Sequence, residues 1–294
     1  MSGSTISNTT ASLSARHSTN QLVGIWRLLQ KVHTSRWTEI YFAQPADATG
    51  SPRADYVVKI VATGAPREQI TGAAQIRAEV QALSRAKHPH LVPLLDFSLD
   101  GVSPFLVMPR LPGNTLGKWI QAERWQPLPV RLWWIRQIAQ GLASLHTTGW
   151  CHGDVKPTNV MLSKSGHATL IDFGFSKAIG NSVSGSPFRG TLDYAAPELL
   201  GDAPNVSAAS DIFSLGVVLW QLQNQATSAR SFATNVTKYV ESDDPVSQLI
   251  WQLTVSNPVD RPTAVVAVER LLRLEIESLG EHIRPTPMRQ RLAA

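Results

Sequence analysis

The sequence predicts an α+β fold of two lobes, a small strand-rich lobe with one main helix followed by a larger, mostly helical lobe. Two observations support this prediction. Apolar residues form short strand-like runs before residue 108, whereas after Pro112-Gly113 they recur at the spacing of amphipathic helices. The chain has 294 residues and 43% hydrophobic content, which is enough for a substantial core and excludes a disulfide mini-fold.

The first lobe is expected to span residues 23–108. Strand-like runs occupy residues 25–43 and 56–62, with a loop of two prolines and a glycine between them. Residues 69–86 carry apolar side chains at helical spacing, and His88-Pro89 follows as a stop signal. Two further short strands are expected, at residues 91–97 and 105–107.

The second lobe is expected to span residues 113–275, after a connection at residues 109–112. Its helices are predicted at residues 116–123, 129–148, 211–223, 245–254 and 264–274. Residues 1–22 are rich in Ser and Thr and lack an apolar stretch, so they are expected to be a disordered tail and not a signal peptide. Residues 276–294 are expected to form a basic C-terminal tail.

The amino-acid composition of the chain limits the kinds of binding partner that can be expected. Lys and Arg number 27 against 22 Asp and Glu, a net charge of +5, but charged residues make up only 17% of the chain. This mild basicity does not indicate nucleic-acid binding, and no apolar window is long enough for a membrane span. The single cysteine, Cys151, excludes a disulfide framework, so a cytoplasmic location is expected. The oligomeric state stays open.

Two polar motifs follow each other in the second lobe. The first holds His152, Asp154 and Asn159, and the second is Asp172-Phe173-Gly174. Phosphoryl transfer requires a carboxylate beside the attacking hydroxyl and oxygen ligands that hold a divalent cation on the phosphates. The order and spacing of the two motifs resemble those of the protein kinase family.

The resemblance implies a bilobal protein kinase fold that uses ATP with Mg²⁺ or Mn²⁺ and acts on protein substrates. Asp154 would be the catalytic base or orienting group, and Lys156 would reach the γ-phosphate. Asn159 and Asp172 would be the metal ligands. The match runs from about residue 26 to residue 274, so it covers nearly the whole chain outside its tails.

The resemblance also implies a nucleotide site. Lys59, at the end of an apolar run, would contact the α- and β-phosphates, and Glu79 on the following helix would pair with it. Met108 would be the gatekeeper, and Pro109 and Leu111 would offer a carbonyl and an amide to adenine. The remaining residues expected at the nucleotide are Ile40, Val57 and Met161.

The sequence departs from the family pattern in the phosphate loop. In this sequence, His33, Ser35 and Thr38 replace the three glycines of the phosphate loop. This indicates either weak ATP binding or phosphate contacts from the side chains of His33 or Ser35.

A second departure from the family pattern is Gly153, which stands where many kinases carry an arginine that binds a phosphorylated activation segment. Activity is therefore not expected to depend on phosphorylation of Ser182, Ser184 or Ser186.

The motifs are compatible with three functions. Lys156 and Gly190-Thr191 favour a protein serine/threonine kinase. A pseudokinase that binds or scaffolds is the alternative suggested by the loop without glycines. A small-molecule phosphotransferase of the aminoglycoside or choline kinase type shares the His-Gly-Asp motif, but it lacks the pair expected between Glu198 and Arg261.

Overall fold

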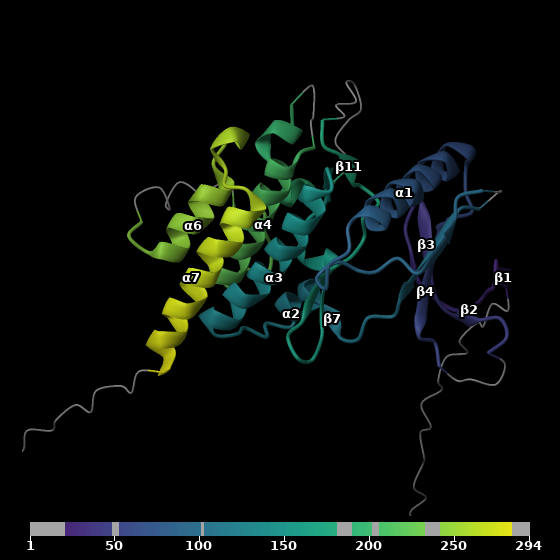
Figure 1. Cartoon of the computed structure of the whole chain (residues 1–294), viewed down its shortest axis with the longest axis horizontal. Helices are drawn as coiled ribbons and strands as arrows, with labels where there is room; N and C mark the ends of the chain where they lie inside the picture. The colour runs from purple at the N-terminus through teal and green to yellow at the C-terminus, as the bar shows by residue number, and fades with distance from the viewer. Residues whose placement is uncertain are drawn as a thin grey trace, which may run out of the picture.

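The computed structural model describes residues 21–48, 53–100, 103–180, 190–201, 206–232 and 242–283. Its N-terminal lobe is an antiparallel six-stranded sheet in the order β1-β2-β3-β4-β6-β5. The strands are β1 (Leu22–Val23), β2 (Trp26–Thr34), β3 (Thr38–Pro45), β4 (Tyr56–Val61), β5 (Asp96–Ser98) and β6 (Phe105–Pro109). The helix α1 (Pro66–Arg85) lies beside this sheet (Figure 1).

Alternation along the strands buries both faces of the sheet. On β6, Phe105 and Val107 join one apolar cluster with Trp26 and Tyr41. Leu106 and Met108 join the other cluster, which includes Ile76 of α1. Because successive side chains of a strand point to opposite faces, these four consecutive positions serve two cores.

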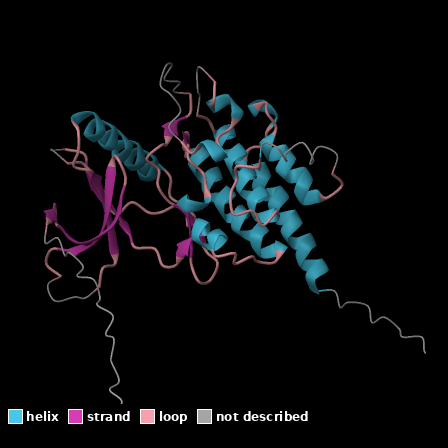
Figure 2. Cartoon of the chain, turned by 180° about the vertical axis from the view of Figure 1, so that it is seen from behind, coloured by secondary structure: helices cyan, strands magenta, loops and turns pink. Residues whose placement is uncertain are grey.

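The helical lobe is built around α3 (Leu128–Thr147) and α4 (Ala208–Gln223). α4 begins at the N-cap Ser207, whose hydroxyl accepts from the Ser210 amide at 3.3 Å. The other helices are α2 (Leu116–Gln121), α6 (Pro245–Thr254) and α7 (Ala264–Ile283). Figure 2 shows two bodies joined by short connections, with the sheet and α1 in one and the remaining helices in the other. None of the described helices is both long and apolar enough to cross a membrane.

Short strands and single helical turns connect the helices, and some of them carry the polar motifs. A three-stranded sheet joins β7 (Asn114–Thr115), β9 (Val160–Leu162) and β10 (Ala168–Leu170), and β8 (Trp150–Cys151) pairs with β11 (Lys177–Ala178). The 3₁₀ turns are η1 (Pro157–Asn159), η2 (Leu192–Tyr194), η3 (Pro197–Leu199) and η5 (Pro258–Asp260).

Several boundaries differ from the sequence prediction, and three of them bear on how the lobes are built. Of residues 91–97, predicted as a strand, only Asp96 and Phe97 are in β5, while Leu91 forms a single bridge to Leu170 of the helical lobe. Leu22, assigned to the tail, is in β1, which pairs with β2. The last helix was expected to end at 274 and the domain at 275, but α7 continues to Ile283, and the Arg136–Glu275 ion pair at 2.6 Å joins it to α3.

Candidate active site

The loop that follows β8 is held in place by Asp211 in the first turn of α4. Its Oδ2 accepts from the His152 amide at 2.7 Å, and its Oδ1 accepts from the Gly153 amide at 2.8 Å. His146 Nε2 lies 2.9 Å from the same Oδ2, and Asp211 is almost completely buried. A buried carboxylate that binds two successive amides fixes the backbone just before Asp154.

His152 braces this loop from inside. Its Nδ1 accepts from the Asp154 amide at 3.2 Å, and its Nε2 lies 3.2 Å from the carbonyl oxygen of Ile171. The buried ring packs on Phe173, with 4.6 Å between ring centroids. His152 therefore ties the loop of Asp154 to the segment that carries Asp172 and has no metal-binding arrangement around it among the described residues.

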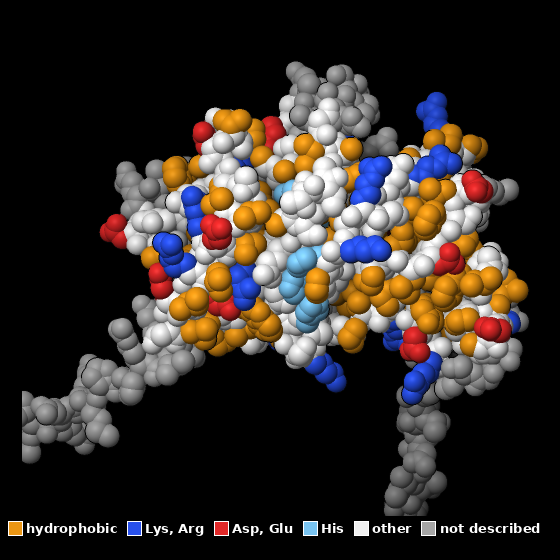
Figure 3. Space-filling view, in the orientation of Figure 1, with side chains coloured by type: hydrophobic (Ala, Val, Ile, Leu, Met, Phe, Trp, Pro, Cys, Tyr) orange, Lys and Arg blue, Asp and Glu red, His pale blue; other side chains and the backbone are white. Residues whose placement is uncertain are grey.

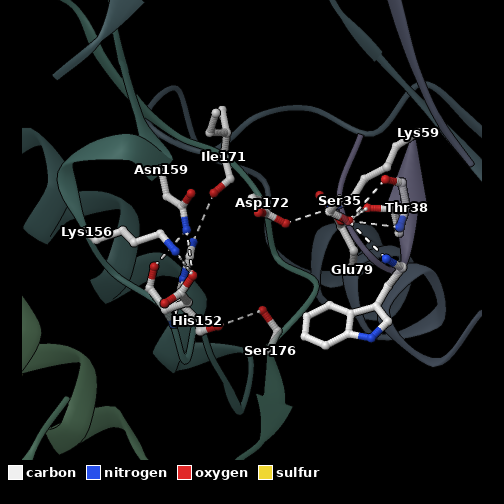
Figure 4. Close-up of polar contacts among 12 residues, drawn as sticks. Ser35, Thr38, Lys59, Glu79, His152, Lys156, Asn159, Ile171, Asp172 and Ser176 are labelled. Atoms are coloured by element: carbon white, nitrogen blue, oxygen red, sulfur yellow. Dashed lines mark hydrogen bonds and ion pairs between the residues drawn. The ribbon is translucent and has the colours of Figure 1, made fainter. Parts of the chain in front are cut away.

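The Asp154 carboxylate lies at the centre of a polar cluster, and its partners Lys156 and Asn159 are labelled in Figure 4. Its Oδ1 accepts from the Thr191 amide at 3.0 Å, and its Oδ2 lies 2.5 Å from Lys156 Nζ. Lys156 also donates to Thr191 Oγ1 at 2.7 Å. The cluster thus joins the predicted catalytic pair to a threonine 35 residues further along the chain.

Asn159 and Asp172 fit the chemistry of a divalent cation site. The Asn159 amide nitrogen donates to the backbone oxygen of Asp154 at 2.9 Å and to its Oδ2 at 3.1 Å, which fixes the side chain and turns its Oδ1 to the other side. Asp172 has φ of 65°, a left-handed conformation that a residue other than glycine rarely adopts. A fixed amide oxygen and a half-exposed carboxylate are the ligands that hard cations such as Mg²⁺ prefer.

Lys59 forms two ion pairs, one within the N-terminal lobe and one to the segment of the helical lobe that carries Asp172. Its ammonium lies 2.6 Å from Glu79 Oε2 on α1 and 2.6 Å from Asp172 Oδ1. Burial alone lowers the pKa of Lys59, but the two carboxylates outweigh burial and raise it. Burial likewise opposes ionisation of Asp172, yet the Lys59 charge lowers the pKa of that carboxyl to about 2. Both groups are therefore charged at neutral pH.

The residues predicted to surround adenine come from three strands of the N-terminal sheet, from the connection after β6 and from β9 of the helical lobe. Ile40 stands opposite Lys59 in the β3–β4 pair, and Val57 stands opposite Met108 in the β4–β6 pair. Pro109 ends β6 as a half-buried residue, and Met161 lies on β9 of the helical lobe. Leu111, just past β6, is half-buried, and Val57 and Leu111 pack against the same apolar core.

The connection between β2 and β3 has the place of a phosphate loop but not its usual chemistry. Ser35 is half-buried, His33 is exposed, and Thr38 is buried. The Ser35 hydroxyl oxygen accepts from the amides of Trp37 at 3.2 Å and of Thr38 at 2.9 Å. The sequence suggested either weak ATP binding or phosphate contacts from the side chains of His33 or Ser35. Since the Ser35 hydroxyl oxygen already accepts from two amides of its own hairpin, a phosphate contact from Ser35 is less well supported.

Glu198 and Arg261 form the pair expected from the sequence. Arg261 Nη1 and Nη2 donate to the two Glu198 carboxylate oxygens at 2.7 and 2.8 Å. The guanidinium is fully buried, and it also donates to the carbonyl oxygens of Val255, Ala209 and Ser256. Such a bidentate pair anchors the end of the segment that carries Thr191 to the body of the helical lobe.

Gly153 occupies a position that a larger residue would strain. Its φ is +79°, and a Cβ built there would lie 2.5 Å from the carbonyl oxygen of Phe175. The glycine therefore allows the catalytic loop and the start of the activation segment to approach closely. Ser182, Ser184 and Ser186, on whose phosphorylation activity is not expected to depend, lie outside the described residues.

Two features of the site were missed by the sequence analysis. Thr191 was used only to favour one branch of the family, whereas the structure places it against both Asp154 and Lys156. Gly72 on α1 was not noticed, although a Cβ at this position would lie 2.2 Å from the carbonyl oxygen of Trp37. A lone glycine inside a strong helical pattern is the one sequence signal that could have drawn attention to it.

This chain is similar in sequence to several known proteins. It is similar to the serine/threonine-protein kinase PknL of Mycobacterium tuberculosis, 28% identical over 225 residues that cover 71% of this chain and 55% of PknL. It also resembles the probable serine/threonine-protein kinase pknA2 of Bifidobacterium longum, 29% identical over 73% of this chain and 30% of that protein. Human serine/threonine-protein kinase ULK3 is 33% identical over 49% of this chain and 30% of ULK3. The chain thus spans about half, or less, of the length of these curated relatives.

The profile of the family described as Protein kinase domain matches residues 48–273, which is most of the chain. The matched region contains Lys59, Glu79, Asp154 and Asp172, and the structure joins Lys59 to both Glu79 and Asp172 at the junction of the two lobes. The chain therefore belongs to the protein kinase family, and its fold is the bilobal α+β fold that its sequence predicts.

Proposed function

We propose that this protein is a serine/threonine kinase that transfers the γ-phosphoryl group of ATP to hydroxyl groups of protein substrates. The observation that carries the proposal is the cluster in which Lys156 Nζ lies 2.5 Å from Asp154 Oδ2 and 2.7 Å from Thr191 Oγ1. The cluster brings the Lys156 ammonium, the Asp154 carboxylate and Thr191 of the activation segment into contact. The names of PknL, pknA2 and ULK3 support the same activity.

Each residue of the cluster has a role in this proposal. Asp154 would orient the substrate hydroxyl and accept its proton, while Lys156 would stabilise the negative charge on the transferred group. Lys59, held between Glu79 and Asp172, would position the α- and β-phosphates.

Asn159 and Asp172 would hold Mg²⁺ or Mn²⁺, whose charge neutralises the phosphates when the cation is bound. The fixed Asn159 side chain supports this assignment, because its amide nitrogen is engaged by Asp154 and its oxygen is left to act as a ligand. Adenine would lie against Ile40, Val57, Met108 and Met161, with the Pro109 carbonyl and the Leu111 amide as its polar partners.

The two alternative functions receive unequal support. Against a small-molecule phosphotransferase stands the buried Glu198–Arg261 pair, which belongs to a segment that such enzymes lack. In favour of a pseudokinase stands the β2–β3 hairpin without glycine. Turnover, with a high Michaelis constant for ATP, is favoured by the complete set of catalytic and nucleotide-site residues Lys59, Glu79, Asp154, Asn159 and Asp172.

A reducing cytoplasmic location fits the single cysteine, Cys151, which is buried and free.

The proposal is tested by incubating the full chain with ATP, Mg²⁺ and a generic basic protein and locating transferred phosphate by mass spectrometry. Asp154→Asn should lower the rate by at least about a hundredfold, because it removes the proton acceptor. Asp100→Asn, on an exposed turn, is the matched control and should keep the wild-type rate. A wild-type protein that binds ATP but transfers nothing would make the pseudokinase the correct description.

A further inference from the structure

The tip of the β2–β3 hairpin is closed by its own serine. The Ser35 hydroxyl oxygen accepts from the Trp37 and Thr38 amides at 3.2 and 2.9 Å, and its hydrogen has the Thr38 carbonyl oxygen at 3.1 Å as an acceptor. The Ser35 amide also donates to that carbonyl oxygen at 2.9 Å. One side chain therefore engages two consecutive backbone donors of the tip (Figure 4).

Consecutive backbone amides in a tight turn form an anion site, and in protein kinases the turn at this place covers the nucleotide phosphates. An amide that already donates to a hydroxyl is not available to a phosphate oxygen unless that bond breaks. The Ser35 hydroxyl occupies the position of an internal acceptor, so it competes with phosphate for the same two hydrogens.

The tip is also docked onto its surroundings by three contacts. The Trp37 carbonyl oxygen accepts from the Ala62 amide at 2.9 Å and approaches α1 at Gly72 so closely that a Cβ there would lie 2.2 Å away. Arg36 Nε lies 2.8 Å from Glu68 Oε1 at the start of α1. The Trp37 ring meets Phe175 edge-on, with 6.2 Å between centroids, just after the Asp172-Phe173-Gly174 motif.

The family match supports the view that this hairpin departs from its relatives. It begins at residue 48, after β2 and β3, although both strands are present and pair over most of their length. The part of the lobe that the profile leaves out is therefore the part that holds the closed tip.

We propose that Ser35 limits nucleotide affinity by occupying the Trp37 and Thr38 amides, so that the phosphates bind only when this serine gives up its hydrogen bonds. The inference rests on the proposed function, since it assumes that ATP binds beneath the hairpin. It makes Ser35 a determinant of affinity for the phosphate part of the nucleotide and not for adenosine.

The test measures binding of adenosine, ADP and ATP, each with Mg²⁺, by isothermal titration calorimetry. Ser35→Ala should tighten binding of ADP and ATP by about fivefold, the effect of one net hydrogen bond, and should leave adenosine unchanged. Ser35→Thr keeps a hydroxyl and should bind ATP as the wild type does. Thr34→Ala, on the neighbouring exposed residue, is the matched control and should change nothing.

The outcomes separate this inference from the proposed function. Weaker ATP binding by Ser35→Ala would mean that the serine contacts the phosphates, and an equal change for adenosine would mean a general effect on the site; either result, or unchanged ATP binding, would overturn the inference. Failure of the wild type and of every variant to bind any of the three ligands would instead reject the proposed function. Melting temperatures without nucleotide establish that each variant is folded.

Discussion

The Arg261 guanidinium is completely buried and holds the Glu198 carboxylate through two hydrogen bonds of 2.7 and 2.8 Å. The two residues are 63 positions apart in the chain. Their pair fixes the end of the activation segment on the helical lobe, and its removal has consequences that can be measured.

Arg261→Lys should lower the free energy of unfolding by about 3 kcal/mol, because an ammonium cannot replace the bidentate pair or all the bonds to the Val255, Ala209 and Ser256 carbonyls. Denaturation by urea measures this change. Arg270→Lys, where the arginine donates to Gln252 on the surface, is the control and should stay within about 0.5 kcal/mol of the wild type. Equal losses in the two variants would contradict the role given to the buried pair.

Gly153 and Gly149 form a matched pair, since both have φ of +79° but only Gly153 has a close neighbour. Gly149→Ala should cost about 1 kcal/mol of stability through the backbone conformation alone. Gly153→Ala should cost about 2 kcal/mol more, because its Cβ would lie 2.5 Å from the Phe175 carbonyl oxygen. Similar unfolding free energies for the two variants would show that the loop adjusts without cost.

Stability should fall as the pH drops below about 6.5, through a stack of three histidines. The His90 ring lies 5.2 Å from the ring of His88 and 4.7 Å from that of His167, and histidines gather in one patch of the surface (Figure 3). Burial lowers the pKa of His90, and His167, His88 and Arg136 lower it further, against a hydrogen bond to the Ala168 carbonyl.

The unfolded chain therefore takes up the His90 proton at a higher pH than the folded chain, and stability decreases as the pH falls through the window below the unfolded value. His90→Asn should show a smaller loss of unfolding free energy between pH 7.5 and 5.5 than the wild type. His33→Asn, outside the stack on β2, should follow the wild-type curve. A wild-type stability that does not change over this range would refute the prediction.

Activity should not depend on phosphorylation of the activation segment. Gly153 carries no guanidinium to bind a phosphate, and the described part of the segment is already held by Thr191 against Asp154 and by Glu198 against Arg261. The variant Ser182→Ala/Ser184→Ala/Ser186→Ala should therefore keep at least about half of the wild-type kcat/KM. A large loss of activity that phosphomimetic substitutions restore would contradict the prediction. It would show that a cationic side chain elsewhere in the protein binds these serines when they are phosphorylated.

Most of the candidate site could be predicted because its motifs are local. The spacing of His152, Asp154 and Asn159 lies within one loop, and Asp172-Phe173-Gly174 within one turn, so their order along the chain identifies them. The helices were predicted within a few residues at most boundaries, since their apolar periodicity is strong. The predicted end of the last helix, at residue 274, was wrong because residues 276–283 were assigned to the basic tail, although the apolar Ile276, Leu279 and Ile283 continue the helical spacing.

The sequence by itself determined the family, the two lobes and the residues that meet at their junction. Only the tertiary structure decided how the departures from the family pattern act. It turned the Ser35 hydroxyl onto the amides of its own hairpin and placed Gly72 against Trp37. The reason is physical: residue type and spacing specify which groups are present, but the partner that a hydroxyl or an amide finds depends on which segments the packed fold brings within about 3 Å.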